Sequence, residues 1–408
     1  MHIWRIILWL SCLIVIYNYA GYAFLVYFFN KLKRPRKIFN KGVSGDDQAY
    51  FPEVAFIVAA YNEEDCIKQK IINSLEQDYP AGKIQFLFIT DGSTDKTPEI
   101  ILQYPSIQLL HKGERKGKSA ALNRAVRETS QEILIISDAN TLLNKEATRN
   151  ITRYYIDKNT GGVAGEKKVI SALSGADAPP SSDQVGSGEG LYWKYESFLK
   201  RLDSEFYSVV GAAGELFSLR RSLYEALPDN VILDDFVLSL RTAQKGYRII
   251  YEPEAYAMEL PSFSLKDEQK RKIRIAAGGF QAIGMLLPLL AFWRHPRLSF
   301  LYFSHRVLRW TLSPLCLILA FISNAILVMA GSAGWIGVIF FACQLLFYGL
   351  ATLAFCFPFF QNRFKPAKLC YYFVFMNLSV ILGFFRFLGG KQAATWEKAR
   401  RAQVPVPE

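Results

Sequence analysis

Long apolar runs without any charged residue constrain this chain more than any other feature. They are Ile6–Phe29, Trp310–Ala330, Trp335–Phe359 and Leu369–Phe385. As a helix, an uncharged apolar segment of about 20 residues spans the roughly 30 Å hydrocarbon layer of a membrane. The chain is therefore predicted to be an integral membrane protein, with its helices at the two ends of the sequence.

Charged residues next to these runs predict the orientation. The first run is followed by KLKRPRK, Lys31–Lys37, and clustered cations favour the cytoplasmic side. A cleaved signal peptide is the alternative for the first run, but its apolar core would be shorter and followed by a cleavage site. The last run is just long enough to span. A full crossing, which we favour, would place the basic tail outside, against the same charge rule.

Charge and cysteine content exclude several classes of function. The formal net charge is +12, yet the basic residues are not interleaved with aromatic ones, which disfavours nucleic acid as a partner. Five of the six cysteines lie in the apolar runs and Cys66 stands alone. Neither a disulfide framework nor a zinc site is expected.

The middle of the chain reads as a soluble α/β domain. EVAFIVAA (Glu53–Ala60), IQFLFITDGS (Ile84–Ser93) and EILIISDAN (Glu132–Asn140) are strand patterns separated by helical spacing, which predicts a mostly parallel sheet covered by helices. The predicted regions are an N-terminal transmembrane helix (1–30), a basic linker (31–47), the α/β domain (48–277), an interfacial amphipathic segment (278–305), C-terminal transmembrane helices (306–390) and a basic tail (391–408).

Polar side chains follow three of the predicted strands, in AAYNEED, TDGSTD and SDAN. A single Asp after a strand is commonly a turn former or a helix cap. In parallel sheets, however, ligands bind beyond the carboxyl ends of the strands, and carboxylates suit a hard divalent cation that bridges phosphates. Three such ends at one edge favour a binding site.

The ordered motifs AAYNEE, DGSTD, RKGKSAALN, DAN, GELFSLRR and LDDFVLSLR resemble those of the inverting glycosyltransferases of family 2. These enzymes have the Rossmann-like GT-A fold. The resemblance covers Val54–Gly279, and the flanking helices are similar to the membrane-bound branch that includes the cellulose, hyaluronan and poly-N-acetylglucosamine synthases. It implies an inverting hexosyltransferase with a cytoplasmic catalytic domain, in the plasma (inner) membrane of a bacterium.

The resemblance also implies a donor site. The positions that match nucleotide-sugar-binding residues of the family are Ala60, Tyr61, Glu63, Asp91, Lys118 and Asp138. Asp138 and Asn140 occupy the places of the D-x-D motif, which implies a divalent metal, Mn or Mg. Asn140 departs from that motif, because an amide replaces the second carboxylate. Lys118 has a solvated loop lysine as its alternative.

Two adjacent acids match the catalytic position of the family. Asp235 matches the base and Asp234 the acidic residue before it. An acceptor hydroxyl needs such a carboxylate to take its proton in the transition state. The alternative is a charged first turn that complements a helix dipole.

The last segment of the resemblance, QKRKIRI (Gln269–Ile275), departs from the Q-x-x-R-W motif of processive synthases. Arg271 replaces the glutamine, Arg274 keeps the arginine, and Ile275 replaces the tryptophan. Arg271 and Arg274 are assigned to the acceptor or the diphosphate, with anionic headgroups as the alternative partner. Trp193, in the predicted helix LYWKYESFLKR, either lines the acceptor channel or packs in the core.

The preceding stretch Ser171–Gly190 is expected to be a loop over the active site or an insertion without function. The expected reaction moves a sugar from a nucleotide-sugar, UDP-linked, to a lipid-linked or growing envelope polysaccharide acceptor, adding one or a few sugars. A processive polysaccharide synthase is one alternative. A subunit of an assembly or export complex that binds nucleotide-sugar without catalysis is another.

Overall fold

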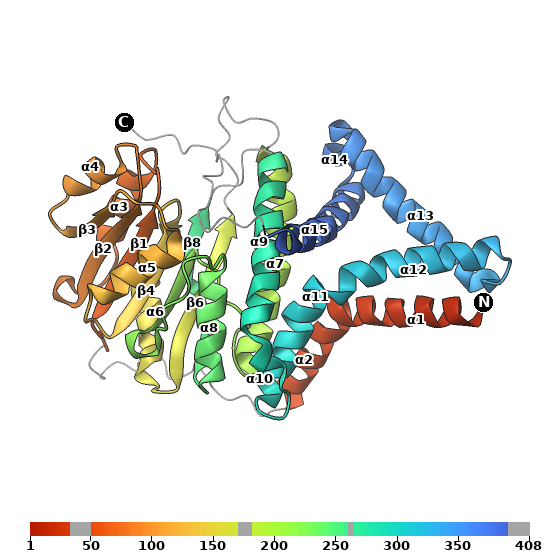
Figure 1. Cartoon of the computed structure of the whole chain (residues 1–408), viewed down its shortest axis with the longest axis horizontal. Coiled ribbons are helices and arrows are strands. Elements are labelled where there is room, and N and C mark those ends of the chain that lie inside the picture. Colours follow the sequence, from red (N-terminus) through yellow and green to blue (C-terminus); the bar gives the residue numbers. More distant parts are fainter. Residues whose placement is uncertain (33–49, 170–181, 260–264, 391–408) are drawn as a thin grey trace.

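The structure is a computed structural model that describes residues 1–32, 50–169, 182–259 and 265–390. The predicted basic tail and nearly all of the predicted basic linker lie outside these ranges, as do residues 171–181 of the predicted loop. The α/β part and the membrane-type helices occupy opposite ends of the molecule, with α7 and α9 between them (Figure 1).

One mixed sheet of eight strands forms the α/β part, in the order β3-β2-β1-β4-β7-β6-β8-β5. Strands β1 to β4 pair in parallel, whereas β7 is antiparallel to both β4 and β6. The expected α/β fold is confirmed. The bounds are β1 (Val54–Ala60), β2 (Ile84–Asp91), β3 (Ile107–Lys112), β4 (Ile133–Asp138), β5 (Leu142–Leu143), β6 (Thr160–Val169), β7 (Leu216–Arg220) and β8 (Arg248–Glu259).

Helices cover both faces of this sheet, which explains why every residue of β1 is buried. They are α3 (Ile67–Leu75), α4 (Thr97–Leu102), α5 (Lys118–Arg127), α6 (Ala147–Thr152), α7 (Ser182–Phe206), α8 (Asp234–Gln244) and α9 (Leu265–Met285). Because α7 begins at Ser182, the second half of the predicted loop Ser171–Gly190 is helical, which corrects that prediction.

The predicted interfacial amphipathic segment, 278–305, is not one helix. Its first part is the end of α9, a 3-10 turn follows at Leu287–Leu290, and α10 begins at Pro296 (Pro296–Tyr302). Pro288 ends the α-helical hydrogen bonding there. Gly278 and Gly279 suit α9 because added Cβ atoms would lie 2.8 Å from Ile232 Cγ2 and 2.7 Å from Trp310 Cε3.

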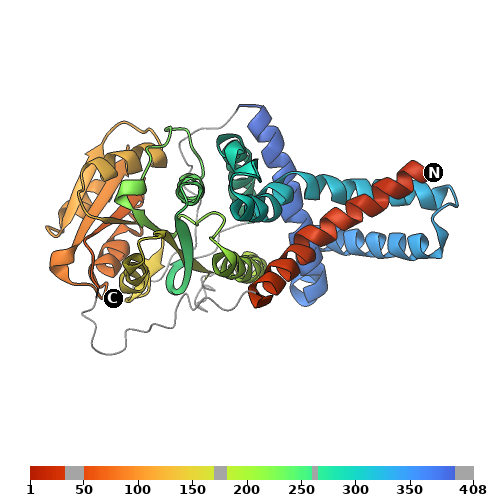
Figure 2. The same cartoon turned by 90° about the horizontal axis from the view of Figure 1, so that it is seen from below.

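Four helices are long and apolar enough to cross a membrane within the described ranges, as predicted. The first, His2–Leu32, consists of α1 (His2–Ile16), a π-helix (Tyr17–Gly21) and α2 (Tyr22–Leu32). The others are α12 (Leu312–Met329), α13 (Gly334–Cys356) and α15 (Lys365–Leu388). In Figure 2, α1, α12 and α13 extend away from the sheet, whereas α15 lies across their direction, next to α9.

Asp203 on α7 joins the first membrane-type helix to the α/β part. Tyr22 Oη donates to Asp203 Oδ1 at 2.5 Å, and His305 Nδ1 lies 2.6 Å from Asp203 Oδ2. His305 belongs to a second π-helix, Phe303–Val307, which faces the first one: Asn18 Nδ2 donates to Ser304 O at 2.9 Å. The chain segments that precede and follow the α/β part therefore meet at α7.

Glu196 completes this joint. It lies on α7 about two helical turns before Asp203. Its carboxylate is buried and accepts hydrogen bonds from Arg306 Nη1 at 2.9 Å and from Arg309 Nη1. Arg309 lies in α11 (Leu308–Trp310), immediately before α12. We name these residues, Tyr22, Glu196, Asp203, His305, Arg306 and Arg309, the α7 ionic joint.

The crosswise placement of α15 predicts the side on which the chain leaves the membrane. If α1, α12 and α13 cross and α15 lies along the surface, residue Gly390 is on the same side as the sheet, in agreement with the basic residues that follow it. We expect a protease-sensitive tag fused after Gly390 to be cleaved only in those vesicles, inside-out or right-side-out, in which the α/β part is also accessible. Cleavage in the opposite vesicles would establish a full crossing by α15.

Candidate active site

The loops that follow β1 and β2 are hydrogen-bonded to each other and form one surface, which we name the β1–β2 ledge. Asn62, whose φ is 54°, donates its backbone N–H to Ser93 Oγ at 3.1 Å, and Thr94 N donates to Asn62 Oδ1 at 2.8 Å. Glu63 N donates to Thr97 Oγ1 at 2.9 Å. Three of the residues that were predicted to bind the nucleotide-sugar lie along this ledge: Ala60, Tyr61 and Glu63.

Their side chains are placed differently. Ala60 is buried at the end of β1, and the half-buried Tyr61 presents its ring to Arg115, whose guanidinium carbon lies 3.7 Å from the ring centroid. The Glu63 carboxylate is directed toward the start of α3, where Cys66 Sγ donates to it at 3.2 Å. The ring of Tyr61 thus forms the flat surface of this ledge, and the guanidinium of Arg115 lies over it.

Asp91 at the end of β2 fixes the loop that leads into α5. Its Oδ1 and Oδ2 accept the backbone N–H groups of Lys116 at 3.1 Å and Gly117 at 2.6 Å. Arg124 Nη2 lies 3.9 Å from Oδ1. Gly117 has a φ of 100°, which only glycine adopts readily. Asp91 therefore holds the loop RKGK in the conformation that places Lys118.

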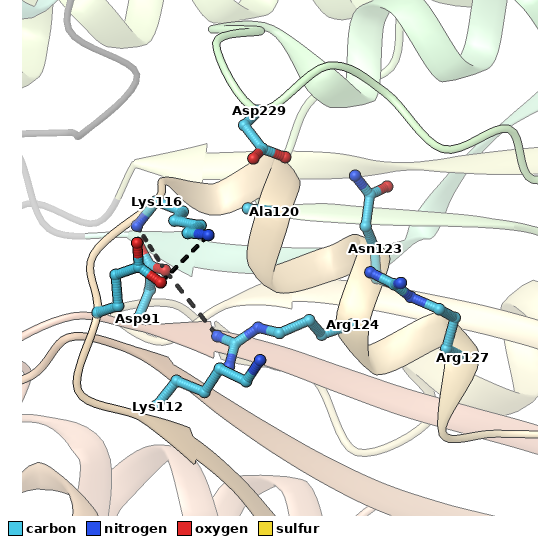
Figure 3. A pocket seen from close by; sticks show the side chains of 9 residues that line it. Asp91, Lys112, Lys116, Ala120, Asn123, Arg124, Arg127 and Asp229 are labelled. Carbon is cyan, nitrogen blue, oxygen red and sulfur yellow. Dashed lines mark hydrogen bonds and ion pairs between the residues drawn. The ribbon is translucent and has the colours of Figure 1, made fainter.

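A cavity of about 160 Å³ lies beside Asp91 (Figure 3). Cations from β3, from the following loop and from α5 line it, together with the acids Asp91, Glu114 and Asp229. Lys116 Nζ pairs with Glu114 at 3.1 Å, and Arg124 faces Asp91. Because acids and cations alternate around it and two pairs of them are in contact, this cavity supports the loop and does not by itself define an anion site.

Lys118, the first residue of α5, is the centre of the site. Its Nζ lies 2.6 Å from Asp138 Oδ1 at the end of β4. Burial would lower the pKa of Lys118, but the carboxylates of Asp138, Asp234 and Asp235 raise it above its ordinary value. The predicted lysine is therefore no solvated loop residue, because it faces acids from β4 and from α8.

Asp234 and Asp235 open α8 on the other side of Lys118. Burial raises the pKa of Asp235 to about 8, with the charge of Asp234 adding to the effect and Lys118 opposing it. Burial also raises the pKa of Asp234, against the charge of Lys118. A Cβ on Gly214 would lie 3.0 Å from Lys118 Nζ and 3.4 Å from Asp235 Oδ2, so the glycine lets these groups share one space.

A buried ion triad below the site was missed by the sequence analysis. Lys167 Nζ on β6 lies 2.8 Å from Glu215 Oε1 and also pairs with Glu259. Burial would raise the pKa of Glu215, but Lys167 holds it well below its usual range. GELFSLRR drew attention to the segment of Glu215, whereas nothing near Lys167 in the sequence signalled its partner.

The residues assigned to the acceptor lie on α9 and α7. Arg271 donates from Nε to Glu268 Oε2 at 3.0 Å and from Nη2 to Oε1 at 3.1 Å, so its guanidinium is engaged within α9. The positive charge of Arg274 lowers the pKa of Asp234, although burial raises it more. Arg274 is therefore within electrostatic reach of the acids of α8.

The aromatic residues of α7 divide between two surroundings. The ring of Trp193 faces Lys167 and Lys200, whose Nζ atoms lie 4.9 and 5.4 Å from its centroid. Tyr195 Oη donates to Tyr19 O in the first π-helix at 2.9 Å. Trp193 thus adjoins the ion triad, while Tyr195 packs toward the membrane-type helices.

The donor atoms at the β4 end fit a divalent cation that takes most of its ligands from a substrate. Among the described residues, no group of three His, Cys, Asp or Glu side chains could hold a metal ion by itself. Asp138 Oδ2 accepts no hydrogen bond from the described part of the chain, and Asn140 adds an amide oxygen two residues on. Mg²⁺ and Mn²⁺ sites of this kind use one or two protein ligands plus phosphate oxygens and water.

Comparison with known proteins shows what the α/β part is similar to. Residues 55–227 match the sequence model of the family described as glycosyl transferase family 2. The chain is 26% identical over 238 residues to poly-beta-1,6-N-acetyl-D-glucosamine synthase of Staphylococcus aureus, covering 56% of this chain and 55% of that protein. It is 25% identical over 247 residues to the probable glycosyltransferase YdaM of Bacillus subtilis, with the same coverage.

The chain thus spans about half the length of the curated relatives it matches. Among solved structures, the mannosyltransferase PcManGT from Pyrobaculum calidifontis, in complex with GDP-Man and Mn²⁺, aligns with 94% of this chain and 99% of its own. The TM-score is 0.70 and the identity 23%. The expected GT-A fold is confirmed. The family match ends at residue 227, before Asp234 and Asp235, so their assignment depends on the geometry described above.

The ion triad leads to a prediction about the free energy of unfolding. Lys167→Met removes the cation between two buried carboxylates, which should cost about 3–5 kcal/mol of folding free energy, as is usual when one partner of a buried pair is lost. Urea unfolding of the purified protein in detergent measures this. Lys168→Met, at the exposed neighbouring position, is the control and should cost less than about 1 kcal/mol. Equal stabilities for the two variants would contradict a structural role of the triad.

Proposed function

We propose that this chain, which carries a family 2 glycosyltransferase domain, is a membrane enzyme that transfers a sugar from a nucleotide-sugar to an acceptor with inversion. One observation carries the proposal: Lys118, Asp138, Asp234 and Asp235, from three separate segments, converge at the carboxyl edge of the parallel strands. That edge is where ligands bind in sheets of this type. The convergence brings a cation for a diphosphate next to a carboxylate for proton transfer.

Asp235 is proposed as the catalytic base and Asp234 as the acid that tunes it. A base works best when its pKa lies near the working pH, and burial next to Asp234 raises the pKa of Asp235 to about 8. Asp235 would take the proton of the acceptor hydroxyl as that oxygen attacks the anomeric carbon. Attack opposite the leaving diphosphate inverts the configuration.

The donor is proposed to lie between the β1–β2 ledge and Lys118. Tyr61 would offer a ring face to the nucleobase, where Arg115 now lies, and Asp91, Ala60 and Glu63 would complete the base end of the site. Lys118 Nζ would contact the diphosphate, because charge-assisted hydrogen bonds to phosphate oxygens are strong. A UDP-sugar is proposed as the donor.

Mn²⁺ or Mg²⁺ is proposed as the cofactor, held by Asp138 and Asn140. When bound, such an ion neutralises charge that develops on the leaving diphosphate. Lys118, whose Nζ lies 2.6 Å from Asp138 Oδ1, would contribute to the same task. In support, the solved mannosyltransferase of similar fold contains Mn²⁺ with its GDP-Man.

The acceptor is proposed to be lipid-linked or a growing envelope polysaccharide, with one or a few sugars added. Ile275 lacks the flat face that a tryptophan would offer a sugar at this position. Arg271 would have to leave Glu268 to reach an acceptor phosphate, whereas Arg274 already acts on Asp234. Trp193 beside the ion triad is the proposed aromatic contact of the acceptor.

The proposed location is the plasma membrane of a bacterium, with the catalytic domain on the cytoplasmic side, where nucleotide-sugars are made. The four candidate membrane helices support a membrane protein, and the curated relatives are bacterial proteins. The runner-up functions are a processive polysaccharide synthase and a non-catalytic nucleotide-sugar-binding subunit. The product and the rate distinguish them.

The experiment uses the full chain, purified in detergent and supplied with bacterial membrane lipid extract. A panel of labelled UDP-sugars and GDP-sugars should include one that gives short, lipid-extractable product, and excess chelator should abolish the transfer until Mn²⁺ or Mg²⁺ is restored. Long water-soluble chains would instead establish a processive synthase. Tight nucleotide binding without any transfer would favour the non-catalytic subunit, and full activity in chelator would disprove the metal assignment.

Asp235→Asn tests the base. The amide keeps the shape of the side chain but cannot accept the proton, so turnover should fall by about 10²–10⁴-fold, the usual contribution of general base catalysis. Calorimetric binding of the nucleotide should stay near the wild-type value. The matched variant Asp234→Asn should retain more turnover. Near wild-type turnover in Asp235→Asn would move the base to another residue.

A further inference from the structure

A row of polar side chains on α3 and at its two ends contacts the segment that carries Asp138 and Asn140. Cys66, Lys70, Asn73 and Gln77 follow the spacing of one helical face. Each donates to the stretch 137–144: Cys66 Sγ to Ala139 O at 3.8 Å, Asn73 Nδ2 to Leu143 O at 2.8 Å and Gln77 Nε2 to Asn144 O at 3.0 Å. These side chains thus hydrogen-bond to the D-x-N turn and to the residues that follow it.

Lys70 is the central member of this row and the one with a basic side chain. Its Nζ donates to Ser137 Oγ at 2.7 Å and to Thr141 O at 2.9 Å. These two residues flank the turn that presents Asp138 and Asn140. The side chain of Lys70 therefore ties the two ends of the turn together from below.

The same contact extends to the acceptor side of the site. Ser137 Oγ donates to the backbone oxygen of Glu215 at 3.0 Å. Glu215 follows Gly214, which lies between Lys118 and Asp235. A single buried chain, Lys70 to Ser137 to Glu215, thus links the proposed metal turn to the segment beside the proposed base.

Lys70 is an unusual residue to find in this place. Its side chain is fully buried, and within the described part of the chain no carboxylate lies in ion-pair distance of it. A buried cation without a counter-ion is costly, and an apolar residue of similar size would stabilise the fold. Local violations of this kind concentrate at functional sites, where stability is lower than it could be.

We propose that Lys70 is a positioning residue, which holds the turn 137–141 and the Glu215 segment in the geometry that the metal and the diphosphate require. This inference rests on the proposed function for its effect on catalysis. Its structural part, that the amino group orders the turn, stands independently. Lys70 acts through Ser137 and Thr141 and does not itself reach the substrate.

The test compares Lys70→Met, Lys70→Gln and the control Lys68→Met in the full chain in detergent. Lys68 is exposed on the same helix. Lys70→Met should bind UDP with Mn²⁺ about 10–100-fold more weakly by calorimetry, the usual effect of losing a group that orients a ligand. Its melting temperature should equal or exceed that of the wild type. Lys70→Gln keeps N–H donors and should recover part of the affinity, while Lys68→Met should match the wild type.

Hydrogen exchange supplies a readout that does not depend on function. The backbone amides of 137–144 and of the Glu215 segment should exchange faster in Lys70→Met and not in Lys68→Met. If the wild type neither binds nor transfers nucleotide-sugar, the proposed function fails and the exchange data alone decide on Lys70. Unchanged exchange, wild-type affinity in Lys70→Met, or a parallel loss of melting temperature and affinity would overturn the inference.

Discussion

The α7 ionic joint is the interaction on which the arrangement of the molecule depends. Glu196 and Asp203 are both buried on α7, and their partners come from the first membrane-type helix and from the segment that leads into α12. A buried carboxylate that lost its partner would be strongly destabilising. Since each side chain of the joint contacts another member of it, α7 can meet the two membrane-type segments in few other ways, and the sheet is held in a set position relative to these helices.

This fixed position matters because α7 also borders the site. Trp193, in the middle of the same helix, lies against Lys167 of the ion triad, and Lys167 pairs with Glu215. The path from the membrane-type helices to the site thus consists of buried ion pairs and aromatic contacts. Such contacts transmit position well, because their geometry allows little drift.

The sequence predicted those parts of the molecule that depend on local pattern. The four apolar helices followed from hydropathy, and the strands β1, β2 and β4 from buried runs that end in polar residues. Asp91, Lys118 and Asp138 meet because parallel strands end at one edge. Lys118 and Asp235 come close together because Gly214 has no side chain to separate them. This contact joins segments that are far apart in the chain. Ordered motifs identified both residues, although the distance between them was not predictable.

Other features depend on partners that no local pattern reveals. The antiparallel insertion of β7 follows from a long return of the chain, and the start of α7 at Ser182 lies in a stretch whose Gly and Ser content favours a loop. Lys70 has the helical spacing of an ordinary surface lysine. Its burial depends on where Ser137 and Thr141 fall in the folded sheet. The motif comparison also did not predict that Arg271 pairs with Glu268, because Glu268 lies outside the motif.

The two facing π-helices determine how far α1 is rotated about the helix axis relative to α2 in the first membrane-type helix. Each π turn takes up one residue more than an α turn, and it leaves carbonyls free for outside donors, as at Tyr19, which accepts from Tyr195. Without that extra residue, α1 would be turned by about 100° relative to α2. Leu8 and Cys12 would then point away from α12 while Tyr22 stayed on Asp203. The length of this helix is therefore fixed to the single residue, even though many of its apolar side chains are exposed and contact no other helix closely enough to be buried.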